Sequence, residues 1–156
     1  DISRGAINIA KNWVKEGSFC LGDARNIPFK SDTFDCIVCT EVLEHIEGDD
    51  AVRECYRVLK PSGVALITVP NGRGIGGRYF PYHIRLFTFE SIMSFLEEGG
   101  FRVISGQKFG LYIPFVSRAL DMISQALSKN LPFSSNLNVR APEFLATSFL
   151  IECRKP

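Results

Sequence analysis

The sequence lacks the features that mark several specialised classes of protein. Its apolar runs are shorter than the roughly 18–20 residues of a membrane-spanning helix, and we expect no secretory leader. Lys and Arg number 18 against 17 Asp and Glu, a net charge of +1, so we expect no nucleic-acid partner that needs a large basic surface. The five cysteines lack the spacing of a disulfide framework, which favours reduced thiols and a cytoplasmic location.

The pattern along the 156 residues predicts a single α/β domain, residues 1–156, in which helices and strands alternate. Ser3 is a candidate N-cap for a helix that ends at Gly17, and Thr88 caps a second helix that ends at Gly99. Further helices are expected near 41–45 and 49–60, and strands at 19–22, 34–40, 64–70, 101–105 and 146–155. Such alternation is typical of a parallel sheet covered on both faces.

An apolar, proline-punctuated segment at 106–142 separates the last two expected strands. It is predicted to hold one helix, with apolar residues at helical spacing between Val116 and Leu127. Its apolar side chains favour an apolar acceptor, a dimer contact or ordinary core packing; they are Phe109, Leu111, Tyr112, Phe115 and Val116.

The glycines at 72, 74 and 77 fit the dinucleotide-binding pattern G-x-G-x-x-G. That pattern binds phosphate because its last glycine opens a helix. Here Pro81 and a run of aromatic residues follow instead, and the acidic residue expected about twenty positions later is absent. We therefore predict a mobile surface loop at this place.

Four stretches carry a more specific signal: "DIS" (1–3), "GDARNIPFKSDTFDCIVCTEVLEHI" (22–46), "AVRECYRVLKPSGVALITVPN" (51–71) and "HIRLFTFESIMSFLEEGGFRV" (83–103). In this order and spacing they resemble the class I S-adenosylmethionine-dependent methyltransferases, in particular the type 11 group that includes quinone-biosynthesis enzymes. The resemblance implies a Rossmann-like three-layer sandwich, with a mostly parallel sheet and an antiparallel last strand. The family's first strand and its glycine-rich loop would precede Asp1, so we expect the chain to be truncated at its N-terminus.

The resemblance also implies which residues hold the cofactor, S-adenosylmethionine. Asp1, followed by Ile2, takes the place of an acidic residue that accepts hydrogen bonds from the ribose hydroxyls. Asp23 would accept from the adenine amine, and the N–H of Ala24 would donate to a ring nitrogen. Thr40, at a strand end, should lie near the methionine part of the donor. A helix-start role for Asp1 and a turn role for Asp23 are the simpler alternatives.

The implied reaction is transfer of a methyl group to an O, N or C atom of a small-molecule acceptor, with residues 27–29 as an apolar wall beside the adenine. In-line transfer depends mainly on proximity and alignment, and a base is needed only if the acceptor must lose a proton. The alternative is a methyltransferase-like domain without catalysis that acts as a binding or scaffold module.

The stretch "EVLEH" places Glu41, Glu44 and His45 at i, i+3 and i+4, which would share one face of a helix. With His83, the other histidine of the chain, they could bind a divalent metal. Some small-RNA and quinone-pathway O-methyltransferases resemble this pattern and look as though they use it for a metal. His45 and His83 are otherwise candidates for acid–base or substrate-orienting roles, and a purely structural role stays open.

Overall fold

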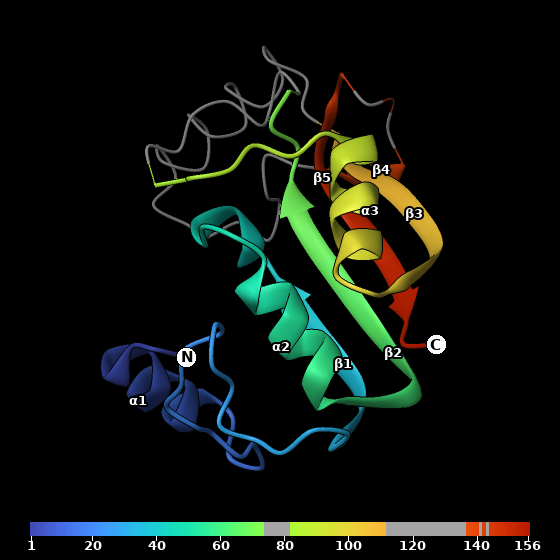
Figure 1. Ribbon diagram of the computed structural model, residues 1–156. Coiled ribbons are helices and arrows are strands. Elements are labelled where there is room, and N and C mark those ends of the chain that lie inside the picture. The colour runs from blue at the N-terminus through green and yellow to red at the C-terminus, as the bar shows by residue number, and fades with distance from the viewer. Residues whose placement is uncertain (74–81, 112–136, 141, 143) are drawn as a thin grey trace, which may run out of the picture.

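The computed structural model describes residues 1–73, 82–111, 137–140, 142 and 144–156. These residues form a five-stranded mixed sheet in the order β1-β2-β5-β3-β4, with helices packed against it (Figure 1). The elements are α1 (Arg4–Trp13), β1 (Phe34–Thr40), the 3-10 helix η1 (Leu43–His45), α2 (Asp50–Val58), β2 (Leu59–Pro70), α3 (Phe89–Glu98), β3 (Arg102–Leu111), β4 (Leu137–Arg140) and β5 (Ala146–Arg154). No helix within these ranges is both long and apolar enough to cross a membrane.

The strand pairings confirm the α/β fold and the antiparallel last strand. β1 and β2 are parallel, whereas β5 runs antiparallel to both of its neighbours, β2 and β3. β3 and β4 are also antiparallel. Within the described residues β1, β2 and β3 therefore run in the same direction, as the sequence predicts for most of the sheet, and β1 and β2 are the parallel pair that lies side by side.

Two helices begin at the caps that the sequence predicts. The Ser3 hydroxyl accepts the N–H of Ala6 at the start of α1. At α3, Thr88 and Ser91 form a reciprocal capping box, in which each side chain accepts the other residue's N–H. Gly100 follows α3 with φ +95°, a left-handed conformation that glycine adopts without steric cost.

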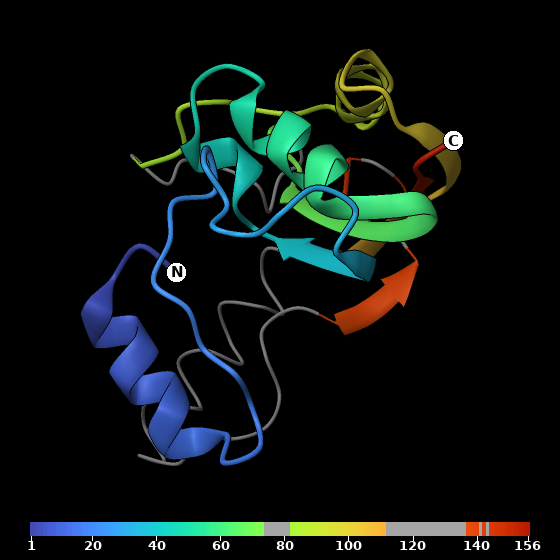
Figure 2. The same cartoon turned by 60° about the horizontal axis from the view of Figure 1, so that its bottom comes forward.

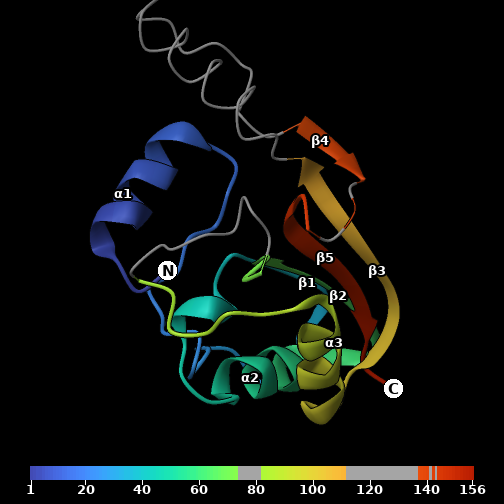
Figure 3. The same ribbon diagram turned by 90° about the horizontal axis from the view of Figure 1, so that it is seen from above.

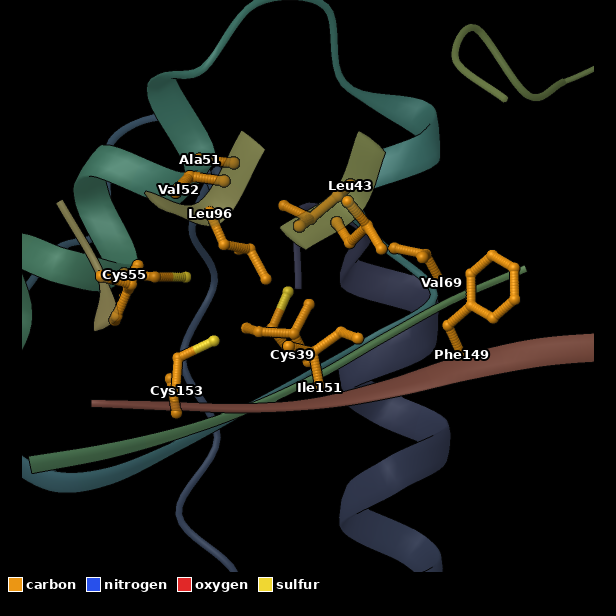
Figure 4. Close-up of a cluster of buried hydrophobic side chains, with 14 of the residues drawn as sticks. Cys39, Leu43, Ala51, Val52, Cys55, Val69, Leu96, Phe149, Ile151 and Cys153 are labelled. Carbon is orange, nitrogen blue, oxygen red and sulfur yellow. The ribbon is translucent and has the colours of Figure 1, made fainter. Parts of the chain in front are cut away.

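The core lies on one face of the sheet, beneath α2 and α3 (Figure 3). Alternate residues of β2 and β5 point into it, because successive side chains of a strand face opposite sides. Figure 4 shows this cluster, with Val69, Phe149, Ile151 and Cys153 from the sheet meeting Val52 and Cys55 of α2 and Leu96 of α3. On the other face, Val38 of β1 is 64% exposed and Ile104 of β3 is 45% exposed.

The N-terminal segment is the part least involved in this core. α1 has no buried residue and stands apart from the sheet (Figure 2). The predicted strand at 19–22 does not form: these residues pair with no strand of the described sheet. Residues 20 and 22 instead bond to Asp1 through two backbone hydrogen bonds.

The predicted insertion at 106–142 begins later than the sequence indicates. Residues 106–111 continue β3 beyond the predicted end at 105, and β4 pairs with that extension. The extension was missed because Gly106 and Gly110 weaken the strand pattern. The helix predicted between Val116 and Leu127 lies outside the described residues, as do Gly74 and Gly77. A dimer contact through this segment stays a prediction.

Candidate cofactor site and a neighbouring glutamate–histidine cluster

The carboxyl ends of β1 and β2 lie side by side, since the two strands are parallel and Thr40 pairs with Thr68 (Figure 1). Ligands of open α/β sheets bind at this edge. The chain leaves β1 at Glu41 and leaves β2 at Asn71. Thr40 is exposed there, at the position the sequence predicts.

Glu41 turns the chain sharply at the end of β1. Its φ of 52° is left-handed, an arrangement that is unfavourable for a non-glycine residue and is often found at functional sites. Its N–H donates to the carbonyl of Thr68 at 3.0 Å, and its Oε1 accepts the Thr68 hydroxyl at 3.0 Å. No local sequence pattern indicates this conformation. The helix predicted around 41–45 is reduced to η1, which leaves Glu41 outside the helical face.

Asn71 fixes the chain where it leaves β2, and sequence analysis did not single it out. Its side chain is fully buried, donates from Nδ2 to the carbonyl of Ala146 at 3.0 Å, and accepts the N–H of Arg73 at Oδ1. A buried amide with such partners determines the path of the backbone. Its position directly after a buried strand, where a polar residue stands out, could have indicated this role from the sequence.

The two aspartates predicted to hold adenosine come from neighbouring backbone segments. The carbonyl of Asp1 accepts the N–H of Gly22 at 3.0 Å, and the backbone nitrogen of Asp1 donates to the carbonyl of Cys20 at 3.2 Å. Asp1 is thereby held beside the residue that precedes Asp23. Its own carboxylate accepts the N–H of Ser3 at 2.7 Å. Ile2, next in the chain, is 69% exposed.

Asp23 forms a forked ion pair with Arg25. Arg25 Nη2 lies 2.6 Å from Oδ2, and Nε lies 3.1 Å from each carboxylate oxygen. The Arg25 backbone N–H also donates to Oδ1 at 2.9 Å. The side-chain bond and then the backbone bond lower the pKa of Asp23 to about 2. Asp23 is thus a permanently ionised acceptor at neutral pH.

The segment after Asp23 is anchored on α2 by Glu54 and Arg57. The N–H of Ile27 donates to Glu54 Oε2 at 2.7 Å, while Arg57 donates to the carbonyls of Ile27 at 3.0 Å and Phe29 at 2.8 Å. Arg57 also forms a two-pronged bond with Glu54, at 2.6 and 2.7 Å. Ala24 and Ile27 pack against the core in consequence. Sequence analysis missed this pair, although its i, i+3 spacing on a predicted helix was visible.

Glu44, His45 and His83 meet beyond the strand ends. Segment 82–85 is tied to η1 because the carbonyl of Glu44 accepts the N–H groups of Ile84 and Arg85, at 2.8 and 3.1 Å. The rings of His45 and His83 have centroids 4.9 Å apart and cross at 70°. The structure therefore brings together three of the four residues predicted as metal ligands, with Glu41 outside the group.

An open hollow of about 470 Å³ lies between residues 85–87 and α3. None of the predicted site residues lines it. The candidate site therefore rests on the strand ends and not on this hollow.

Solved structures with the same fold cover almost the whole chain. A methyltransferase from Thermotoga maritima, described as a possible histamine N-methyltransferase, has a TM-score of 0.73 at 19% identity and is matched over 100% of this chain and 72% of its own. A methyltransferase from Archaeoglobus fulgidus has a TM-score of 0.70 at 17% identity, over 99% of this chain and 74% of its own. At these identities the likeness defines the fold, which is that of the Rossmann-like methyltransferases.

The sequence comparisons match methyltransferases over part of the chain. Residues 1–67 match the family described as a methyltransferase domain, type 11. A demethylmenaquinone methyltransferase from Thermotoga maritima is 33% identical over 89 residues, which are 54% of this chain and 39% of that protein. Over these residues the chain is similar to the class I S-adenosylmethionine-dependent methyltransferases of type 11, the group that its motifs resemble. It spans about a third of the length of the curated relatives it matches.

Proposed function

We propose that this chain transfers a methyl group from S-adenosylmethionine to an O, N or C atom of a small-molecule acceptor, at the carboxyl edge of β1 and β2. The observation that carries the proposal is the backbone pairing of Asp1 with residues 20 and 22. It holds the two carboxylates implied by the family motif on adjacent segments. No relative described above supports the alternative of an inactive scaffold.

The adenosine half of the cofactor would lie against Asp1 and Asp23. A ribose diol presents two donors, which suits the two oxygens of a carboxylate such as Asp1. Adenine presents an amine, which suits the ionised Asp23. The apolar groups of Ala24 and Ile27, packed on the core, would support the ring. Adenine must displace Arg25 from Asp23, so cofactor binding exchanges one charged donor for a neutral one.

The cofactor supplies an activated methyl group when it is bound, and the chain supplies position. Orientation of two reactants can lower a barrier by on the order of 7–11 kcal/mol in favourable cases. Thr40 and Glu41 lie where the methionine part should pass, and the bonds from Glu41 to Thr68 hold that backbone in place. His45 or His83 would serve as a base only for an acceptor that must lose a proton.

The acceptor side of this edge favours an apolar molecule. Along segment 82–86, Tyr82, Ile84 and Leu86 are 78%, 64% and 57% exposed, while His83 and Arg85 between them are half-buried. This alternation presents an apolar strip next to the histidines. The relative that is 33% identical over 89 residues is named as a demethylmenaquinone methyltransferase. That name is consistent with an apolar acceptor.

The test is calorimetric titration of S-adenosylhomocysteine into the full-length protein, including any residues that precede Asp1. Asp23→Ala should weaken binding, because the adenine amine then lacks its acceptor. The loss should be smaller than the contribution of about 1.5–3 kcal/mol from a full charge-assisted bond, since Arg25 competes for Asp23 in the free protein. Asp35→Ala is the matched control, since Asp35 is also an ion-paired aspartate, bonded to Lys60, but sits at the opposite end of β1. Equal affinity for both variants would remove Asp23 from the site.

A further inference from the structure

Two aromatic rings hold Arg85 in the hollow between segment 85–87 and α3. Its guanidinium carbon, Cζ, lies 4.3 Å from the ring centroid of Phe95 and 5.7 Å from that of Phe87. Stacking of this kind fixes the flat face of a guanidinium and leaves its N–H edge able to donate. Within the described part of the chain no carboxylate lies within ion-pair distance of Arg85. Asp49, an acid on which the charge of Arg85 acts, is bonded to Arg53 instead, at 2.7 Å.

Glu98 lines the same hollow at the last position of α3. It is exposed, and together with Glu97 it places two carboxylates in a last turn that has no basic residue. The C-terminal end of a helix carries a partial negative charge, so carboxylates are unfavourable there unless a cation neutralises them. Among the ion pairs of the described residues none includes Glu98. The hollow therefore presents one cation and one anion that are not paired with each other.

The two charges are separated by about one turn along α3. Arg85 lies over Phe95, and Glu98 follows Phe95 by three residues, a rise of about 4.5 Å. When a second copy approaches with its α3 antiparallel, a twofold axis between these positions brings each Arg85 opposite Glu98 of the partner subunit. A contact of this kind is isologous, because the same surface on both chains is complementary to itself. The small side chains of Ser91 and Ser94, which also line the hollow, allow the two helices to approach.

We propose that this hollow is the contact surface of a homodimer, in which Arg85 of each chain binds Glu98 of the partner subunit. The carboxylate accepts from the N–H edge that stacking leaves available, and it receives the cation that the end of α3 lacks. An interface of one helix and one short segment is small, and interfaces below about 1,200 Å² are typical of transient complexes, so the dimer is in equilibrium with the monomer. The surface lies far from α1 (Figure 2) and differs from the dimer contact predicted for 106–142. It does not depend on the proposed methyl transfer.

The experiment is sedimentation velocity of the full-length protein over a range of concentrations, at low and at high salt. The wild type should dimerise as its concentration rises, and salt should weaken the dimer because exposed charge pairs are screened. Arg85→Glu and Glu98→Arg should each weaken the dimer at least about tenfold, since each replaces two attractive contacts with two repulsive ones. Glu97→Arg is the matched control, with the same change of charge at an exposed neighbour that does not line the hollow. It should dimerise like the wild type.

A mixture of Arg85→Glu and Glu98→Arg distinguishes a contact between two chains from a contact within one. In the mixed dimer both contacts again join opposite charges, so the mixture should dimerise about as tightly as the wild type although neither variant does so alone. Circular dichroism identifies a variant that fails to fold, and Glu98→Arg, at an exposed helix end, keeps the test decisive beside its control if Arg85→Glu does.

Three results would overturn the proposal. The first is a wild type that stays monomeric at every concentration, which would leave the hollow to another partner or to another part of the full chain. The second is a dimer that both charge reversals leave intact, as a contact through a different surface would be. The third is a mixture of the two variants that dimerises no better than either variant alone.

Discussion

Replacing Glu54 with Ala should destabilise the protein and weaken cofactor binding together. The Glu54 side chain is 16% exposed and accepts three hydrogen bonds, from the Ile27 N–H and from two nitrogens of Arg57. An unsatisfied buried donor costs about 1–3 kcal/mol, and a bond to a charged group contributes about 1.5–3 kcal/mol. Because these terms overlap and Arg57 can turn to water, we expect a net loss of about 2–4 kcal/mol.

Urea denaturation of the wild type and of Glu54→Ala measures this loss in the free energy of unfolding. The control is Asp49→Ala, which removes an exposed ion pair with Arg53 on the same helix, and exposed pairs contribute little. Affinity for S-adenosylhomocysteine should fall in Glu54→Ala, since residues 27–29 lose their anchor. A loss of stability no larger than that of the control would refute the assigned role of Glu54.

Acid provides a second measurement of the same interaction. The hydrogen bonds from Arg57 lower the pKa of Glu54 in the folded protein. A lowered pKa contributes stability above the unfolded value of about 4.3, and that contribution is lost as the pH falls through the folded value. The stability difference between the wild type and Glu54→Gln should therefore be constant near neutral pH and shrink below about pH 4.3. A difference that grows in acid would contradict this sign.

Two further predictions concern the C-terminal end and the acceptor strip. Lys155→Met should lower the free energy of unfolding, measured in urea, by about 2–3 kcal/mol. The side chain of Lys155 is 12% exposed, and its Nζ donates to two backbone carbonyls at the end of α2. An equal loss in Lys60→Met, on the surface, would contradict this prediction. Ile84→Ser should raise the KM for an apolar acceptor about tenfold with little change in kcat. Ile9→Ser, an equally exposed isoleucine on α1, which stands apart from the sheet, should leave both constants unchanged.

Local sequence patterns predicted the elements whose causes are local. Ser3 and Thr88 cap their helices as expected, because a hydroxyl at that position can reach an N–H three residues later. The strand predicted at 64–70 lies within β2. The order of short motifs indicated the methyltransferase family whose model matches residues 1–67. The roles of Asp1 and Asp23 toward the cofactor stay predictions.

Features that depend on distant partners could not be predicted in this way. Glu41 adopts its left-handed backbone because Thr68, from the neighbouring strand, holds both its N–H and its side chain. Residues 19–22 have the composition of a strand but join no ladder of the described sheet. The metal-ligand hypothesis assumed a helical face, whereas three of its residues meet because segment 82–85 bonds to η1.

A structure of the full-length protein with S-adenosylhomocysteine tests the central claim most directly. We predict the adenine amine about 3 Å from the Asp23 carboxylate, with Arg25 displaced from its present bond and the ribose hydroxyls on Asp1. A cofactor bound elsewhere, or an Arg25–Asp23 pair left intact beside it, would contradict the account.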